Sequence, residues 1–170
     1  MGKQVILVLE ADEESRSDYI YISSVLDEWY NYRLNSDVKI TPIFMGGKGN
    51  YKKKKIINKI NKYSKIYQGG DTYVVYCFDT DKYDAKPEDA KTLEEEKRYC
   101  ETCGYDFVWF CHDIEEVFLG KSVQKTEKTN KAREYSLSRG NRRMDKTRFQ
   151  SEIMLKGRSN LVKVMEKIFD

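Results

Sequence analysis

The stretch "YVVYCFDTDKYD", residues 73–84, decides the fold of this chain. Its first six residues are apolar and rich in β-branched and aromatic side chains, which is typical of a strand buried on both faces of a parallel sheet. The run ends abruptly on Asp79 and Asp81, with one residue between them. Aspartates are ordinary turn formers after strands, but a pair of them also binds cations, so this junction is the first candidate site.

Three other segments have the same strand-like character, namely residues 4–9, 38–44 and 105–111. Pro42 makes the second of these an edge or irregular strand, because proline cannot donate a hydrogen bond to a neighbouring strand. Amphipathic segments with apolar residues every three to four positions alternate with the strands. The expected helices cover about residues 13–32, 56–67, 87–103 and 113–120. This alternation predicts an α/β fold, a Rossmann-like parallel sheet of about four strands flanked by helices.

The 170 residues fit a single domain. Residues 1–120 are expected to form the α/β core. Residues 121–145 are polar and basic with almost no apolar periodicity, so they predict a long loop or insertion. Residues 146–170 predict a basic helical C-terminal part packed on the core, with helices at about 146–156 and 160–169.

Charge is distributed unevenly along the chain. Residues 121–170 contain 14 Lys and Arg against 6 Asp and Glu, a net charge of +8, whereas residues 1–120 carry a net charge of −5. A basic tail on an acidic body favours a polyanionic partner, although a solvated basic surface is the simpler alternative.

The composition favours a cytoplasmic protein without a membrane segment. Charged residues make up 35% of the chain, and no apolar run approaches the roughly 20 residues that a membrane span needs. The apolar run at residues 5–9 does not resemble a signal peptide. Cys100 and Cys103 form a CxxC motif, but there is no second such motif and only one histidine. Reduced thiols are therefore favoured over a zinc site made from the four cysteines.

Carboxylates follow three of the four predicted strands, where ligands of open parallel sheets bind. If the first, third and fourth strands are neighbours, these side chains converge on one edge of the sheet. Such a cluster is costly without a cation, and oxygen ligands favour Mg²⁺ or Mn²⁺. Residues two apart in an extended segment point the same way, so the two aspartates of the DxD are expected to approach one ion together. The carboxylates are Glu10, Asp79, Asp81, Asp113, Glu115 and Glu116.

Glu10 in "VILVLEADEES" and Asp79-Thr80-Asp81 in "VVYCFDTD" resemble the TOPRIM domain of topoisomerases, DnaG-type primases and OLD-family nucleases. In that domain a glutamate closes the first strand and a DxD closes the third, both at a Mg²⁺ site. The chain is most similar to the small RloB-like TOPRIM family of bacterial defence and mobile loci, through "LEADEESRSDYIY", "HDIEEVFL" and "SNLVKVMEKI". It departs from the pattern at Ala11, where a glycine is usual, and in lacking a proline before "HDIEEVFL".

The resemblance implies a metal-dependent nuclease that hydrolyses phosphodiester bonds of DNA or RNA, tRNA included, in antiviral defence or a mobile element. Its metal ligands for Mg²⁺ or Mn²⁺ would be Glu10, Asp79 and Asp81. Its catalytic residues would be the same three with Glu116, and Glu10 would complete the metal shell or accept a proton from the attacking water. The alternative is a module that binds nucleic acid or a partner subunit, with a structural Mg²⁺ site and little or no catalysis.

Two basic patches are expected to bind the phosphates of a nucleic acid without reading its sequence. One combines Lys48, in the glycine loop at residues 46–49, with the lysine run at residues 52–55, for which a solvated helix face is the alternative. The second lies at residues 139–148. The glycine loop lacks the GxxxxGK(S/T) pattern, so it is not a P-loop. The predicted nucleic-acid-binding residues are Lys48, Lys52, Lys53, Lys54, Arg139, Arg142, Arg143 and Arg148.

Other readings of the acidic residues fit less well. A receiver domain needs a lysine after a fifth strand, and the sequence predicts no fifth strand. A haloacid-dehalogenase-type phosphatase has its DxD after the first strand, whereas this chain has it after the third. His112, at the end of the fourth predicted strand, is a candidate base, but a lone histidine beside an aspartate is more often an ordinary hydrogen-bonded residue.

Overall fold

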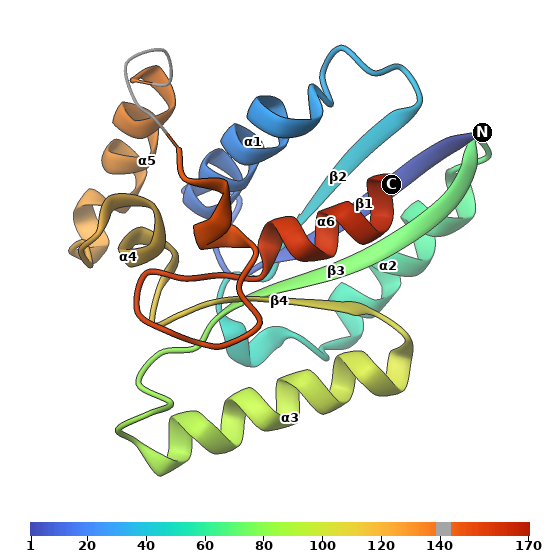
Figure 1. The fold of residues 1–170 in the computed structure, drawn as a ribbon. Helices are drawn as coiled ribbons and strands as arrows, with labels where there is room; N and C mark the ends of the chain where they lie inside the picture. The colour runs from blue at the N-terminus through green and yellow to red at the C-terminus, as the bar shows by residue number, and fades with distance from the viewer. Residues whose placement is uncertain (139–143) are drawn as a thin grey trace.

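The computed structural model describes residues 1–138 and 144–170. A four-stranded, all-parallel sheet with the strand order β2-β1-β3-β4 forms its centre, as Figure 1 shows. The strands are β1 (Gly2–Leu9), β2 (Val38–Phe44), β3 (Gly70–Asp79) and β4 (Asp106–Phe110). The helices are α1 (Ser17–Tyr30), α2 (Lys54–Ile66), α3 (Pro87–Cys103), α4 (Ile114–Leu119), α5 (Lys128–Leu137) and α6 (Leu161–Phe169). The predicted α/β class and parallel sheet are confirmed, and the fold is consistent with a Rossmann-like one.

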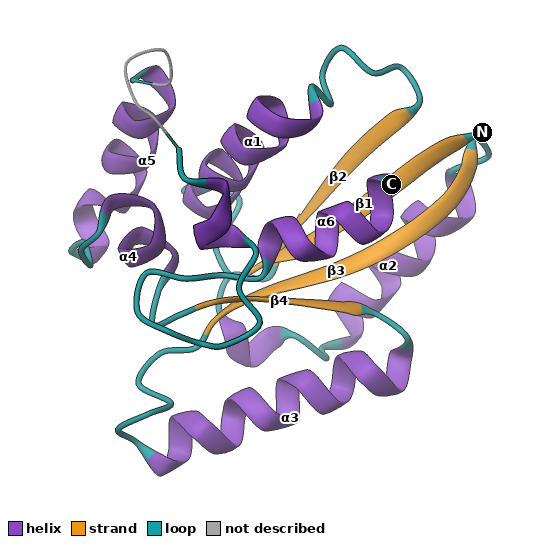
Figure 2. Cartoon of the chain, in the orientation of Figure 1, coloured by secondary structure: helices purple, strands orange, loops and turns teal. Residues whose placement is uncertain are grey.

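Strand β1 lies between β2 and β3, and residues 4–9 are fully buried. Its side chains alternate between two apolar cores. Leu7 belongs to the core formed with α1 and α6, whereas Ile6 belongs to the core formed with α2 and α3. The sheet therefore has helices on both faces (Figure 2), which explains why its central strand is a continuous apolar run. Pro42 lies in β2, which is an edge strand as predicted.

The C-terminal part differs from the prediction at two places. Residues 128–137 form helix α5 instead of a loop, and Ala132 and Tyr135 bury one side of it against the core. The helix predicted at about 146–156 is wrong. Only a 3₁₀ turn, Lys146–Phe149, forms there, and Ile153 and Leu155 after it are exposed. The helix predicted at 160–169 is confirmed as α6.

The segment before α6 covers the free edge of β4. The Ser159 hydroxyl donates to the carbonyl of Trp109 at 2.7 Å and accepts from the N–H of Leu161 at 3.1 Å. The Asn160 side chain accepts from the N–H of Trp109 and donates to the carbonyl of Phe107, both at 2.9 Å. These bonds satisfy edge groups of the sheet and attach the C-terminal helix to the core.

We expect Ser159→Ala to lower the free energy of unfolding by about 1–2 kcal/mol, because it leaves the buried carbonyl of Trp109 without this donor and removes the acceptor at the start of α6. Urea denaturation followed by circular dichroism measures the change. Ser136→Ala, at an exposed position of α5, is the matched control and should change stability by less than about 0.5 kcal/mol. Equal stability of the two variants would contradict this role for Ser159.

In the described part of the chain, no helix combines the length and the apolar character needed to cross a membrane.

Candidate functional site

A cavity of about 480 Å³ lies at the carboxyl ends of β1 and β3. This is the end of the sheet beside which α4 and α5 lie in Figure 1. The cavity is lined by Glu10 after β1, Asp18 in α1 and Asp79 at the end of β3. Its remaining lining comes from the loop before α1 and Ser17, the loops after β2 and before α5, and the first turn of α5. This lining includes a fourth carboxylate, Asp12, which accepts from the Ser15 N–H at 2.6 Å. Carboxylates from three different elements thus face one space.

Glu10 and Asp79 are held together by the sheet. Their strands are hydrogen-bonded neighbours, and the Asp79 N–H donates to Glu10 Oε1 at 2.9 Å. The side chain of Asp79 is fixed in turn, because its Oδ1 accepts from the N–H of Ile114 at 2.9 Å. In residues 1–138 and 144–170, no hydrogen bond reaches the second oxygen of either carboxylate. Each carboxylate is therefore oriented by one oxygen and keeps the other for a ligand.

Asp18 is a third carboxylate of the cavity that the sequence did not single out. It lies in the first turn of α1, and its Oδ2 accepts from the N–H of Ala11 at 3.0 Å. An acidic residue at the start of a helix is common, because it interacts favourably with the helix dipole, so its position carried no special signal. Only the turn between β1 and α1 brings Asp18 back beside Glu10.

The three carboxylates have raised pKa values. Burial raises the pKa of Glu10 from its ordinary value of 4.5 to about 8. The positive charge of Lys48 lowers this pKa, and the negative charge of Asp18 raises it further. Burial, together with the charge of Glu10, raises the pKa of Asp79 well above its usual range. Burial also raises the pKa of Asp18. Ionisation of all three carboxyl groups is therefore unfavourable in the cavity without a cation. A bound cation would make their ionised forms favourable.

Asp81 does not face the same way as Asp79. Strand β3 ends at Asp79, and Asp81 has a φ of 50°, so the expectation that both aspartates extend from one strand face is wrong. Asp81 Oδ2 instead accepts from Lys48 Nζ at 2.7 Å. Lys48 also donates to the carbonyl of Asp79 at 2.7 Å, and its Nζ lies 3.8 Å from both Glu10 Oε1 and Glu96 Oε1. Lys48, predicted to bind phosphate, neutralises the acidic edge in this structure.

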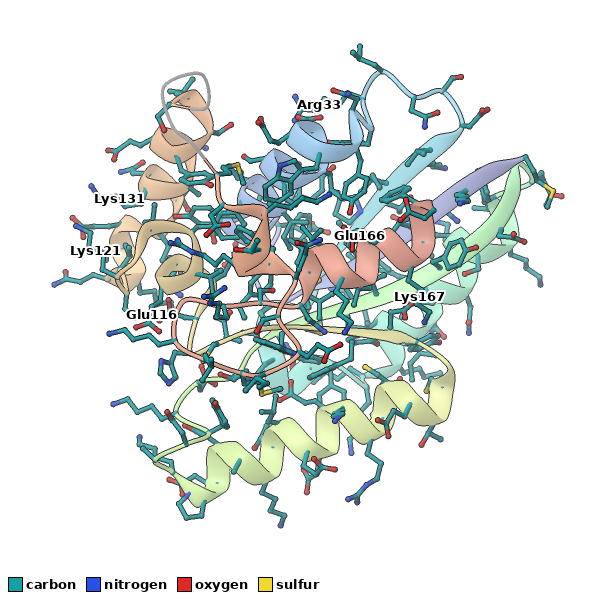
Figure 3. The ribbon with its side chains drawn as sticks, viewed as in Figure 1. Arg33, Glu116, Lys121, Lys131, Glu166 and Lys167 are labelled. Atoms are coloured by element: carbon teal, nitrogen blue, oxygen red, sulfur yellow. The ribbon has the colours of Figure 1, made fainter. Side chains whose placement is uncertain are left out.

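Asp113 and Glu116, before and in α4, do not line the cavity, whereas Glu115 lies 3.5 Å from Lys128 of its lining. Asp113 caps the helix by accepting from the Glu116 N–H at 2.8 Å. Glu116, labelled in Figure 3, contacts His112, with 2.8 Å between its Oε2 and His112 Nδ1. The other ring nitrogen of His112 lies 3.1 Å from Asp84 Oδ2. Burial lowers the pKa of His112, but its hydrogen bonds with Asp84 and Glu116 outweigh this effect and raise it, which disfavours a role as a base.

The donor set of the cavity suits a hard divalent cation. Within the described residues, no group of three or more His, Cys, Asp or Glu side chains is arranged to hold a metal ion by itself. Mg²⁺, however, is usually bound by one or two carboxylates, while waters and substrate phosphates complete its shell. The oriented pair of Glu10 and Asp79 meets that requirement with oxygen donors only. The four cysteines are free thiols, and Cys103 alone among them is exposed.

The predicted nucleic-acid-binding residues are dispersed. Lys52, Lys53 and Lys54 are exposed at the start of α2. Arg148 is half-buried and donates from Nη1 to the carbonyl of Val117 at 3.2 Å. The remaining predicted residues, Arg139, Arg142 and Arg143, lie outside the described residues.

No family model, no curated protein and no solved structure matches the chain. The cavity and the charged residues around it are therefore what points to a function.

Proposed function

We propose that this protein is a metal-dependent nuclease of the TOPRIM type, related to the RloB-like family, in which Glu10 and Asp79 bind Mg²⁺ or Mn²⁺. The observation that carries the proposal is the hydrogen bond of 2.9 Å between the Asp79 N–H and Glu10 Oε1 in an open, carboxylate-lined cavity. A glutamate after the first strand and an aspartate after the third lie on neighbouring parallel strands, which agrees with the TOPRIM pattern.

A divalent cation bound here supplies Lewis-acid stabilisation of the charge that develops on phosphate oxygens during hydrolysis. The carboxylates Glu10 and Asp79 would hold it, and Asp18 adds a third negative charge to the same cavity. Glu10 would complete the metal shell, and its raised pKa without metal means that its carboxyl is largely protonated near neutral pH until a cation is bound.

Lys48 and Asp81 have a supporting role in this proposal. Asp81 positions the Lys48 ammonium beside Glu10, through contacts of 2.7 Å and 3.8 Å. A cation at that place lowers the cost of gathering negative charge before the metal and substrate arrive. Asp81 therefore acts through Lys48, and the proposed metal ligands are Glu10 and Asp79. We assign no catalytic role to Glu116, because it is engaged with His112.

DNA or RNA, with tRNA included, is the proposed substrate. The exposed lysines at the start of α2 and the net charge of +8 over residues 121–170 are suited to a polyanion. A cytoplasmic role in antiviral defence or a mobile element, alone or with a partner subunit, follows from the RloB-like resemblance.

A cleavage assay tests this function. Plasmid DNA, single-stranded DNA and total tRNA are each incubated with the protein in Mg²⁺, Mn²⁺ or EDTA. We expect cutting of at least one substrate with a divalent cation and none in EDTA. Tight binding without cutting under every condition would instead support the binding module, an alternative favoured by the position of Lys48 among the carboxylates.

A further inference from the structure

The cavity that holds the carboxylates Glu10, Asp18 and Asp79 also has basic residues in its lining. Lys125, Lys128 and Thr129 line it, from the 3₁₀ turn Lys125–Glu127 and the first turn of α5. The sequence placed these residues in a featureless basic loop, so none of them had a predicted role. Carboxylates and ammonium groups in one cavity are the two components that bind a cation together with its phosphate.

Helix α5 is held firmly at this place. The Ser15 and Thr129 hydroxyl oxygens lie 3.1 Å apart, which links the loop before α1 to the first turn of α5. Nearly two turns further along, Tyr135 packs on Tyr21 of α1 with 5.3 Å between the ring centroids. Lys128 therefore extends from a packed helix rather than from a loop, and its backbone position is fixed relative to the cavity.

Glu115 explains where the ammonium of Lys128 lies. The Glu115 side chain is fully buried, and neither of its carboxylate oxygens has a hydrogen-bond partner in the described part of the chain. Its Oε1 lies 3.5 Å from Lys128 Nζ. A buried carboxylate without partners is costly, and one ammonium group offsets that cost. Glu115 thus keeps the Lys128 ammonium at the cavity.

We propose that Lys128, positioned by Glu115 and assisted by Lys125, binds a phosphate group of the nucleic acid in this cavity, beside the cation site of Glu10 and Asp79. The inference rests on the proposed function for its substrate class. The Thr129 hydroxyl holds α5 in place through Ser15, and Lys125 adds a second ammonium group for phosphate oxygens. Lysines of the predicted loop, rather than Lys48 of the glycine loop, then contact the reacting phosphate.

The test compares two lysines of the same helix. Lys131, labelled in Figure 3, does not line the cavity and pairs with Glu134 at 3.3 Å. Binding of a fluorescent single strand of about 12 nucleotides is followed by anisotropy at several salt concentrations, in EDTA and in Mg²⁺. We expect Lys128→Ala to weaken binding about tenfold and to reduce the salt slope by about one, as loss of a phosphate contact does. Lys131→Ala should stay within about twofold of the wild type.

A second pair of variants guards against misfolding, because Lys128→Ala leaves Glu115 buried without its ion-pair partner. The double variant Glu115→Gln, Lys128→Met removes both charges and should melt like the wild type while binding as weakly as Lys128→Ala. Glu115→Gln alone keeps the ammonium group and should bind more tightly than the double variant. Circular dichroism melts of all four variants accompany the binding curves.

The results separate this inference from the proposed nuclease activity. Wild-type affinity in both Lys128 variants, or an equal loss in Lys131→Ala, overturns the phosphate site even if the protein cuts its substrate. Loss of binding confined to the Lys128 variants supports the phosphate site even if no substrate is ever cut. Cleavage in Mg²⁺ bears only on the nuclease, since the binding measurement in EDTA needs no metal.

Discussion

The Asp79→Asn protein is expected to cut nucleic acid at least about a hundredfold more slowly than the wild type, which is the usual cost of losing one charged group that stabilises a transition state. Asparagine keeps an oxygen that can accept from the Ile114 N–H, so the fold around the site should persist. In the proposed metal site, it removes the negative charge that would hold the cation beside Glu10. Initial rates of cleavage in Mg²⁺, on the substrate that the wild type cuts, measure the loss.

Asp71→Asn is the matched control for this change. Asp71 lies in the same strand, exposed at the opposite end of β3, where its backbone lies opposite that of Lys3 in the register of β1 and β3. The identical substitution should leave the cleavage rate within about twofold, because it changes a solvated charge far along the strand from the cavity. Similar melting temperatures of the two variants would show that lost activity is not lost folding. Normal cutting by Asp79→Asn would contradict the proposed metal site.

The same assay distinguishes Asp81 from Asp79. If Asp81 acts only by positioning Lys48, Asp81→Asn should retain more activity than Asp79→Asn, with a loss of about tenfold, because the ammonium keeps its contact with the carbonyl of Asp79. If Asp81→Asn were as inactive as Asp79→Asn, the result would support Asp81 as a metal ligand, as the TOPRIM resemblance implies.

Without a divalent cation, the protein is expected to lose stability as the pH rises from about 5 to about 9. Glu10 has a folded-state pKa of about 8 against an ordinary value of 4.5. Below pH 4.5 its carboxyl is protonated in both states, so burial has no ionic cost. Between 4.5 and 8 the unfolded chain ionises while the folded chain keeps the proton, which favours unfolding. Above pH 8 the full cost is present, a few kcal/mol at about 1.4 kcal/mol per pKa unit.

Asp18 and Asp79 contribute to the pH dependence in the same direction, since burial raises both of their pKa values. Lys48 and Lys128 stay charged throughout this range, because their nearby carboxylates raise their pKa values against the effect of burial. Urea denaturation in EDTA across the pH range measures the slope. Repeating the series in Mg²⁺ should show a stabilisation that grows with pH. At higher pH the carboxylates are already ionised, so the cation does not have to displace protons to bind.

Glu10→Gln should flatten the pH dependence of the free energy of unfolding and abolish most of the stabilisation by Mg²⁺. The substitution removes a buried titrating group and one proposed metal ligand together. Glu14→Gln, at an exposed position four residues later, is the control and should behave like the wild type. A pH slope unchanged by Glu10→Gln would show that the cavity carboxylates are not responsible for it. A stability gain in Glu10→Gln at pH 8 without metal would show that the site is kept at the expense of stability.

Much of the sheet was predictable from the sequence alone. Strands β1 and β3 are buried on both faces, so each is a continuous apolar run that stands out among charged neighbours. Parallel strands end at the same edge, so Glu10 and Asp79 were expected to meet once their strands proved to be neighbours. The apolar runs are local properties of the sequence, and the meeting of Glu10 and Asp79 follows from the shared direction of their strands.

The tertiary structure alone decided the rest of the site. Helix α5 has only a narrow buried side, at Ala132 and Tyr135, so its apolar pattern is too weak to predict a helix, and packing on the core is what orders it. Asp18 joins the cavity and Asp81 turns toward Lys48 because of backbone turns that no periodic pattern encodes. Hydrophobic periodicity reports which face of a segment is buried, whereas the meeting of charged side chains from distant segments depends on loop conformation and on packing between elements.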